Sequence, residues 1–259
     1  MIKRASHEDR LRIAGEICVK VKAELGDGLR AFVIFASTAK DADGPYSDLE
    51  LMAITTDDYQ ESACGFMYDD VYCEVYYVPF QTALKEAKKV DYEWPVSADQ
   101  WHRMLPLYVK EGDDCLERIQ TTARQSLRQT GKFDKEARGA MFAVQEDYGS
   151  LVNAWEAGVK SDVSTNLFNL SLSVIHVVAF VNRYFYQSLR NAWEEAKKLN
   201  KLPKDFVKLI DIVHGNTQAS LEERYRSADQ LWQNMQGWMD ELDIDWVSEG
   251  KFKLPGKKK

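Results

Sequence analysis

Strand-forming patterns are confined to the first half of this chain, and that division constrains the fold more than any other sequence feature. Four short apolar runs predict strands, and they lie at residues 31–36, 49–55, 71–78 and 105–109. From about Asp113 onward, the apolar residues recur at helical spacing instead. The sequence therefore predicts an α+β N-terminal domain, residues 1–125, and an all-helical C-terminal domain, residues 126–259, with the join between Asp113 and Lys132.

Helix signals are found in both halves. Ser6 followed by Asp9 is a capping-box pattern, which predicts that a helix begins there. Gly26 and Gly28 end this first periodic pattern. The other predicted helices lie at residues 80–90, 114–129, 134–158, 165–195, 204–214 and 217–242.

Composition indicates a globular protein that binds neither nucleic acid nor a membrane. Of the 259 residues, 45% are hydrophobic, which is enough for a sizeable core. The net charge of −7 is opposite to that of a nucleic-acid-binding surface and suits a cationic substrate or a divalent metal. The N-terminus lacks the apolar stretch of a signal peptide, and the most apolar window, residues 174–185, is too short to span a bilayer. The four cysteines have no zinc-type spacing, so we expect buried, reduced thiols and a cytoplasmic location.

Two carboxylates, Asp48 and Glu50, alternate in a predicted strand that follows a turn. Alternate strand residues share a face, so the pair forms an oxygen site of the kind that Mg²⁺ prefers. Glu74 lies in the next predicted strand, where an unpaired charge would be costly. If these two strands pair, three carboxylates converge into a centre suited to two-metal phosphoryl transfer. These carboxylates also have ordinary interpretations. Asp48 and Glu50 would lie on a solvated strand edge, and Glu74 would be the partner in an ion pair.

The loop that precedes the acidic pair contains small and polar residues. Ser37 follows the first predicted strand, and a small residue there lets backbone N–H groups approach a phosphate. Lys40 would add positive charge beside it. The alternatives are a turn or helix cap for Ser37 and a solvated surface lysine for Lys40.

Residues 35–50 carry a family resemblance. Phe35-Ala36-Ser37, followed by Ser47-Asp48-Leu49-Glu50, resembles the polymerase-beta-like nucleotidyltransferase superfamily, whose signature is a strand, Gly-Ser and a later Asp-x-Asp or Asp-x-Glu. More narrowly, the chain resembles the kanamycin (aminoglycoside 4′-) nucleotidyltransferases in residues 43–50, in Trp94-Pro95 and in residues 105–108. The resemblance covers nearly all of the N-terminal half and is weaker in the helical half.

This resemblance implies a fold, an assembly and an activity. The fold would be a mixed, mainly five-stranded sheet with flanking helices, followed by a helical bundle. The assembly would be a homodimer with each active site at the subunit interface. The activity would be Mg²⁺-dependent transfer of AMP from ATP to a hydroxyl of an aminoglycoside-like polycation, with release of pyrophosphate, which would inactivate the antibiotic. The alternatives are another acceptor, either a partner protein or a metabolite, and a non-catalytic nucleotide-binding relative.

The resemblance also implies roles for residues of the N-terminal half. Asp48 and Glu50 would be metal ligands as well as catalytic residues, and Glu74 would complete the acidic cluster. Three residues would face the nucleotide phosphates: Ser37, Lys40 and Ser47.

The general base would come from the first long helix of the second domain. The resemblance places Asp147 there, with Glu146 as the alternative. Three positions depart from the family pattern: Ala36 stands where the family has glycine, and Tyr72 and Leu151 stand where it has lysine.

Overall fold

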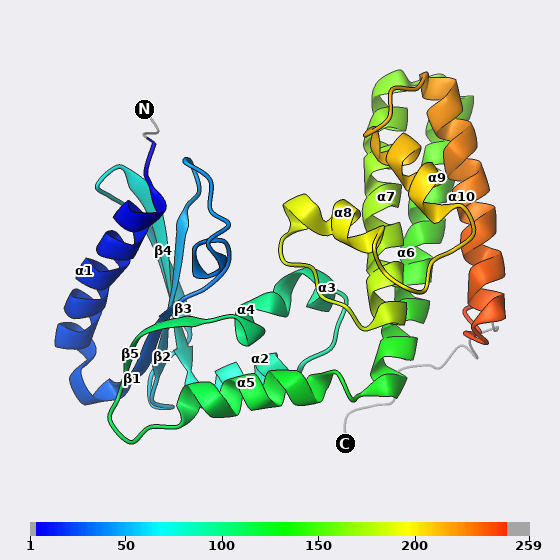
Figure 1. Cartoon of the computed structure of the whole chain (residues 1–259). Coiled ribbons are helices and arrows are strands. Elements are labelled where there is room, and N and C mark those ends of the chain that lie inside the picture. Colours follow the sequence, from blue (N-terminus) through cyan, green and yellow to red (C-terminus); the bar gives the residue numbers. More distant parts are fainter. Residues whose placement is uncertain (1–3, 248–259) are drawn as a thin grey trace, which may run out of the picture. The chain divides into compact units, whose positions relative to one another are not determined.

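The chain forms two compact units in the computed structural model, which describes residues 4–247 (Figure 1). The first unit comprises the described residues up to Lys132 together with Arg183–Ala192. The second comprises Phe133–Asn182 and the described residues from Trp193 onward. A short segment that lies within the helical half of the sequence therefore belongs to the first unit.

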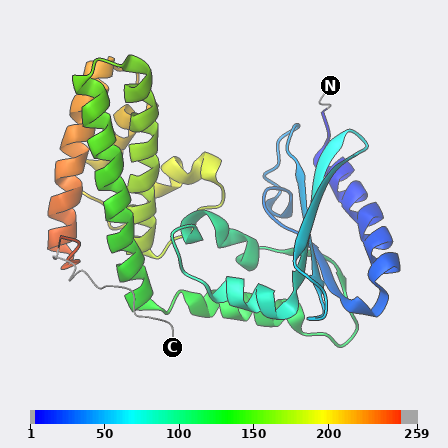
Figure 2. The ribbon, with the colours of Figure 1, turned by 180° about the vertical axis from the view of Figure 1, so that it is seen from behind.

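A mixed five-stranded sheet forms the centre of the first unit, as expected, with the strand order β3-β4-β2-β1-β5 (Figure 2). The strands are β1 (Leu29–Ile34), β2 (Leu49–Thr55), β3 (Ser62–Tyr68), β4 (Val71–Pro79) and β5 (Leu105–Val109). β2 and β4 run parallel, and the other neighbouring pairs are antiparallel. The parallel pair is the part of the sheet that carries the acidic residues.

Helices cover both faces of this sheet, because consecutive strand residues point to opposite sides. Phe32 belongs to the core under α1 (His7–Leu25), whereas its neighbour Val33 belongs to the core on the other face. That second face is covered by α2 (Phe80–Lys88), α4 (Asp99–His102) and α5 (Cys115–Ser126), and the short helix α3 (Trp94–Ser97) lies between α2 and α4 in the chain. Figure 2 shows α1 and the α2/α5 pair on opposite sides of the sheet. The predicted capping box at Ser6 is confirmed, because its Oγ accepts a hydrogen bond from the Asp9 backbone N–H.

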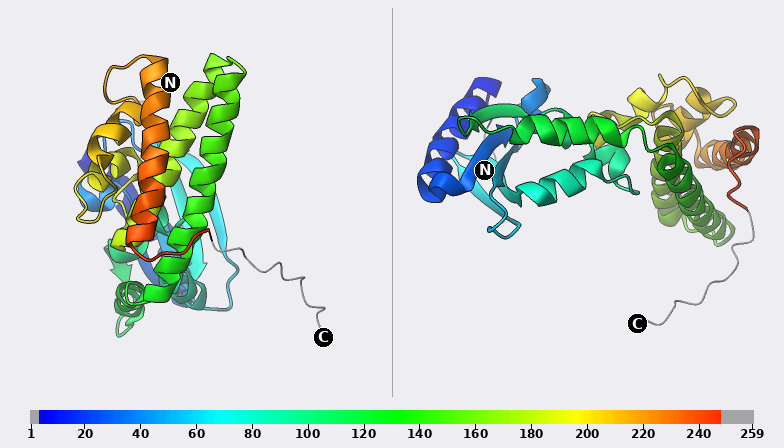
Figure 3. Two further views of the ribbon diagram at one scale, coloured as in Figure 1. Left: turned by 90° about the vertical axis from the view of Figure 1, so that its right-hand side faces the viewer. Right: turned by 90° about the horizontal axis from the view of Figure 1, so that it is seen from below.

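Three long helices run side by side in the second unit (Figure 3). They are α6 (Thr130–Glu156), α7 (Lys160–Asn182) and α10 (Leu221–Glu241), accompanied by the shorter α8 (Ala192–Ala196) and α9 (Phe206–His214). Side-chain hydrogen bonds join them: Ser173 of α7 donates to Asp147 of α6, and Tyr148 of α6 donates to Asp229 of α10, both at 2.5 Å.

The second half of α7, from Leu170 to Phe180, is almost entirely buried and forms part of the core of this bundle. The 23 residues of α7 are enough, by length and composition alone, to cross a membrane. The apolar window noted in the sequence, residues 174–185, covers only the C-terminal part of this helix and extends beyond its end. However, 67% of its most apolar 18-residue stretch is buried within the protein. An apolar helical stretch that is buried in this way is typical of a protein core.

Two other expectations about elements differ from the structure. The helix predicted for residues 165–195 is interrupted, since α7 ends at Asn182 and the backbone of Arg183 has a φ of 50°. The chain becomes helical again only at η3 (Leu189–Asn191) and α8. The strand β3 was not predicted from its residues, because most of its side chains are exposed and no apolar alternation marks it. The cysteines are free, as expected, with Cys64 exposed and the other three buried.

Candidate active site

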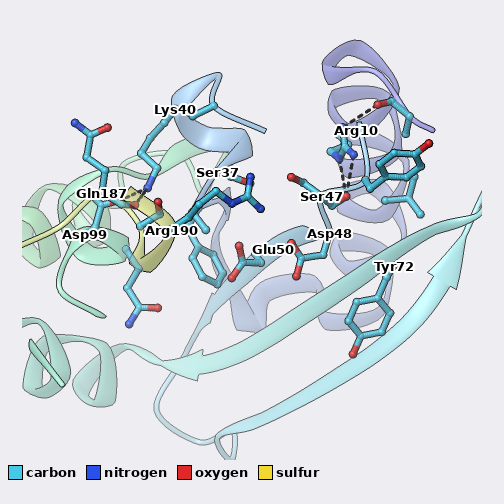
Figure 4. A pocket seen from close by; sticks show the side chains of 18 of the residues that line it. Arg10, Ser37, Lys40, Ser47, Asp48, Glu50, Tyr72, Asp99, Gln187 and Arg190 are labelled. Atoms are coloured by element: carbon cyan, nitrogen blue, oxygen red, sulfur yellow. Dashed lines mark hydrogen bonds and ion pairs between the residues drawn. The ribbon is translucent and has the colours of Figure 1, made fainter. Parts of the chain in front are cut away.

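The loop between β1 and β2 borders a cavity of about 760 Å³ in the first unit (Figure 4). Five of the residues proposed from the sequence line this cavity: Ser37, Lys40, Ser47, Asp48 and Glu50. Every lining residue comes from the first unit, including several from the segment 183–192. The structure therefore brings the loop and the acidic pair together around one cavity.

Arg10 of α1 holds this loop in place. Its Nε and Nη2 donate to the Ser47 carbonyl oxygen at 3.0 and 2.8 Å, and its Nη1 donates to Asp43 Oδ2 at 3.0 Å. The side chains of Arg10 and Asp43 are each 1% exposed. A buried ion pair with this many hydrogen bonds is costly to break. The backbone next to Asp48 is thus fixed against the helix.

The loop backbone begins with an unusual conformation at Ala36. Its φ of 55° lies in the left-handed region, which a residue with a Cβ adopts only at a cost of about 1 kcal/mol. Ser37 comes next, directly before the single turn η2 (Thr38–Lys40). Its side chain makes no capping hydrogen bond to that turn. Ser47 closes the loop, with its Oγ accepting a hydrogen bond from the Gly44 N–H at 2.9 Å.

Glu50 is the most perturbed acid of the cavity. It lies in β2 directly opposite Glu74 of β4. The strands that carry Glu50 and Glu74 therefore pair, as the convergence of the three carboxylates requires. Burial, followed by repulsion from Asp48 and then from Glu74, raises the pKa of Glu50 to about 7, against a smaller opposing effect of Lys40. Such a shift indicates that the site concentrates negative charge which a cation would relieve.

Glu74 itself does not line the cavity, and its partners are tyrosines. The hydroxyls of Tyr72 and Tyr76 each donate to one of its carboxylate oxygens at 3.1 Å. Burial and the nearby Glu74 raise the pKa of Tyr76 to about 12. The charge in this apolar strand is therefore satisfied by neutral donors and faces Glu50 from the neighbouring strand.

A second group of potential metal ligands was not found from the sequence. Among the described residues, His7, Asp41 and Asp43 form a trio whose ligand atoms all lie within 4.8 Å of one another. Asp48, Glu50 and Glu74 do not form such a compact trio within that part of the chain. His7 Nδ1 lies 2.7 Å from Asp43 Oδ1 while Arg10 bonds the other oxygen, so this trio is an ion-pair network that anchors the loop.

Lys40 occupies a buried position rather than the solvated surface. Its Nζ donates to Asp99 Oδ2 at 2.5 Å and to the carbonyl oxygen of Gln187. The side chains of Lys40 and Asp99 are 10% and 6% exposed. The structure therefore places the ammonium group between α4 and the segment 183–192. No sequence pattern indicated either partner, because they are remote along the chain.

The two candidate general bases lie on α6 in the second unit. Asp147 is partly buried, which raises its pKa, and Ser173 donates to its Oδ2. Glu146 is exposed on the surface of the helix. Leu151, which stands where the family has lysine, is completely buried. These surroundings distinguish the two acids, since Asp147 is partly buried and hydrogen-bonded whereas Glu146 is exposed.

Comparisons with known proteins identify relatives of this chain. The sequence profile of the KNTase C-terminal domain matches residues 116–245. The chain is 25% identical over 235 residues to an aminoglycoside nucleotidyltransferase (4') of Staphylococcus aureus, covering 91% of this chain and 92% of that protein. It is 23% identical over 236 residues to an enzyme of the same name from a Bacillus species, covering 91% and 92%.

Among solved structures, the fold is similar to that of a nucleotidyltransferase-like protein from Exiguobacterium sibiricum 255-15. The TM-score is 0.53 at 12% sequence identity, and the match covers 89% of this chain and 75% of the other. At this identity the likeness concerns the fold alone.

Proposed function

Because the chain belongs to the nucleotidyltransferase family that carries the KNTase C-terminal domain, we propose that it transfers AMP from MgATP to a hydroxyl of an aminoglycoside. Pyrophosphate is the second product, and the modified antibiotic is inactive. The reaction takes place in the cytoplasm, where MgATP is available.

The observation that carries this proposal is the acidic pair in the cavity of the first unit. Asp48 and Glu50 line it together with Ser37 of the loop, and Glu74 faces Glu50 from β4. Carboxylate oxygens are the ligands that Mg²⁺ prefers. The pKa of Glu50 is raised first by burial and then by repulsion from Asp48 and Glu74, and a bound cation would relieve both effects. We assign Asp48 and Glu50 as metal ligands, with Glu74 completing the cluster.

The chemistry is an in-line displacement at the α-phosphorus of ATP. The acceptor hydroxyl oxygen forms a bond to this phosphorus, the bond to the β-phosphate oxygen breaks, and pyrophosphate leaves with that electron pair. Asp48 and Glu50 would hold Mg²⁺, which would supply the positive charge that neutralises the phosphates. We assign the cavity wall of Ser37 and Ser47 to the nucleotide phosphates. Lys40, which the resemblance also places there, adds its charge to this wall while it stays bonded to Asp99.

The proton of the acceptor hydroxyl goes to a carboxylate of α6. We assign this role to Asp147, because burial raises its pKa whereas Glu146 is exposed. The family resemblance supports a homodimer in which this base reaches the nucleotide site of the partner subunit. The catalytic set then consists of Asp48, Glu50 and Glu74 from one subunit and Asp147 from the other.

A polycationic acceptor suits the acidic surroundings. The main cavity is lined by Asp48, Glu50 and Asp70, among others. A second cavity of about 200 Å³ in the same unit has Glu93 and Trp94 in its wall. Amines of an aminoglycoside would be attracted to such carboxylates, whereas an anionic acceptor would be repelled.

The direct test is to incubate the protein with MgATP and kanamycin and to measure pyrophosphate release. We expect metal-dependent turnover that Asp48→Ala reduces by at least about 100-fold, because the loss of a charge-stabilising group has effects of that order. Asp27→Asn is the matched control, since this acid is fully exposed and lies outside the cavity.

Two results would overturn the proposal. One is turnover that Asp48→Ala leaves unchanged. The other is AMP transfer to a partner protein or a metabolite while aminoglycosides are left unmodified, which would assign the same site to another acceptor. An aminoglycoside without the 4′-hydroxyl identifies the position that is modified.

A further inference from the structure

Three cationic side chains line the main cavity, and two of them are already committed to the protein. Arg10 is buried and bonds to Asp43 and to backbone carbonyl oxygens. Lys40 is buried and bonds to Asp99 and to the Gln187 carbonyl oxygen. Neither can turn toward a bound anion without giving up a buried ion pair, which is a costly exchange.

Arg190 is the third of these cations, and it differs from the other two. It is exposed, and within residues 4–247 it has no hydrogen-bond or ion-pair partner. Figure 4 shows its side chain extending into the cavity toward Ser37, above Glu50. An unpaired guanidinium therefore points at the loop that we assign to the nucleotide phosphates.

The backbone that leads to Arg190 is held to the first unit by two residues that precede it, Tyr186 and Gln187. Tyr186 is completely buried and donates its N–H to the Pro95 carbonyl oxygen at 2.7 Å. The next residue, Gln187, receives the Lys40 ammonium on its carbonyl oxygen. Ser188 then caps the short turn η3, which contains Arg190. Lys40 and Asp99 thus position this segment, so the Arg190 side chain extends from a backbone that is held in place.

We propose that Arg190 binds the β- and γ-phosphates of the nucleotide, the part that leaves as pyrophosphate. A guanidinium is a planar fork that matches two phosphate oxygens at once and remains charged throughout the reaction. It supplies a positive charge that no ion pair within the described residues already uses, and it does so without transferring a proton. This assignment rests on the proposed function, because it requires a triphosphate in the cavity.

The test compares the binding of three probes, each with Mg²⁺, by isothermal titration calorimetry: ATP, inorganic tripolyphosphate and AMP. Arg190→Gln should raise the Kd for ATP and for tripolyphosphate about 10- to 100-fold, as expected for the loss of hydrogen bonds between charged groups. AMP, which lacks the β- and γ-phosphates, should bind equally to the wild-type protein and the variant. Arg190→Lys should give an intermediate loss for ATP, since it keeps the charge but not the fork.

Arg183→Gln is the matched control, because it makes the same substitution in the same segment at a residue that does not line the cavity. It should leave all three Kd values unchanged. The proposal is overturned if Arg190→Gln binds ATP and tripolyphosphate as tightly as the wild-type protein does, or if Arg183→Gln weakens both equally.

The outcomes separate this assignment from the proposed function. Tight ATP binding and turnover that do not depend on Arg190 would refute the assignment alone. Tripolyphosphate binding that depends on Arg190, without AMP transfer to any aminoglycoside, would support the assignment and refute the acceptor. A wild-type protein that binds neither ATP nor tripolyphosphate would refute both.

Discussion

At the scale of single residues, Glu50 shows most directly what the site requires. Its carboxyl group is removed from water and faces Asp48 and Glu74, so the ionised form is disfavoured and its pKa rises to about 7. Because the folded-state pKa lies above the ordinary value, this group stabilises the fold fully at acidic pH. That contribution is lost as the pH rises from about 4.5 through about 7.

Replacing Glu50 should therefore stabilise the metal-free protein at alkaline pH. Glu50→Gln is expected to increase the free energy of unfolding by about 1–2 kcal/mol at pH 8, after allowance for partial exposure, and by little at pH 4. The measurement is urea denaturation in EDTA across this pH range. Glu24→Gln on the exposed side of α1 is the control and should show no such difference. A Glu50→Gln effect that does not vary with pH would contradict this account.

Individual side chains were predictable from the sequence where a local pattern encodes them. The two-residue spacing of Asp48 and Glu50 predicted that they share a strand face, and the structure has both in the wall of one cavity. The Lys40–Asp99 ion pair joins residues 59 positions apart, and the Lys40–Gln187 bond spans 147 positions. Such contacts arise only when the chain is folded, so no local pattern reports them.

At the scale of elements, the β1–β2 loop depends on one anchor in α1. Arg10 joins the helix to Asp43 and to the end of the loop, and it does so in a fully buried environment. The loop therefore presents Ser37 and Ser47 to the cavity as part of the folded core, rather than as a flexible surface segment.

The buried Arg10–Asp43 ion pair should contribute more to the free energy of unfolding than an exposed ion pair of this unit does. Asp43→Ala is expected to destabilise the protein by about 3 kcal/mol, because it leaves the Arg10 guanidinium buried beside no carboxylate. Glu16→Ala breaks an exposed pair with Arg12 and should cost less than about 1 kcal/mol. Urea denaturation monitored by tryptophan fluorescence measures both variants. Equal losses would show that burial does not strengthen the Arg10–Asp43 pair.

Elements were predicted well where apolar residues repeat and poorly where they do not. β2 and β4 have alternating or continuous apolar faces, and their bounds agree closely with the sequence pattern. β3 is an edge strand whose hydrogen bonds to β4 define it, although its side chains are mostly exposed. The interruption after Asn182 was missed because the apolar pattern continues beyond it, while contacts with Pro95 and Lys40 draw the backbone away.

At the scale of the whole molecule, the proposed homodimer would build each active site from two chains. The nucleotide cavity belongs to the first unit and the candidate base Asp147 to the second. A symmetric homodimer would place the same pair of surfaces in two equivalent sites. This arrangement makes complementation between inactive variants possible.

Mixing Asp48→Asn with Asp147→Asn after reversible dissociation of the dimers should restore about a quarter of the wild-type activity. Half of the dimers in a random mixture are heterodimers, and each of these has one intact site. The readout is pyrophosphate release with MgATP and kanamycin. A mixture of Asp48→Asn with Glu50→Gln should stay inactive, because both changes lie in the first unit. Failure of the first mixture would place the base and the nucleotide site in the same chain.

The return of residues 183–192 to the first unit has a consequence for how this protein is made. A ribosome releases the chain from its N-terminus, and domains generally fold as they emerge. The sheet and its helices can assemble once residue 132 has appeared, but Tyr186, the carbonyl partner of Lys40 and Arg190 are not yet synthesised. While α6 and α7 are being synthesised, the first unit therefore lacks the residues of segment 183–192 that line its cavity. Lys40 can bond to the Gln187 carbonyl oxygen only after both helices have been made.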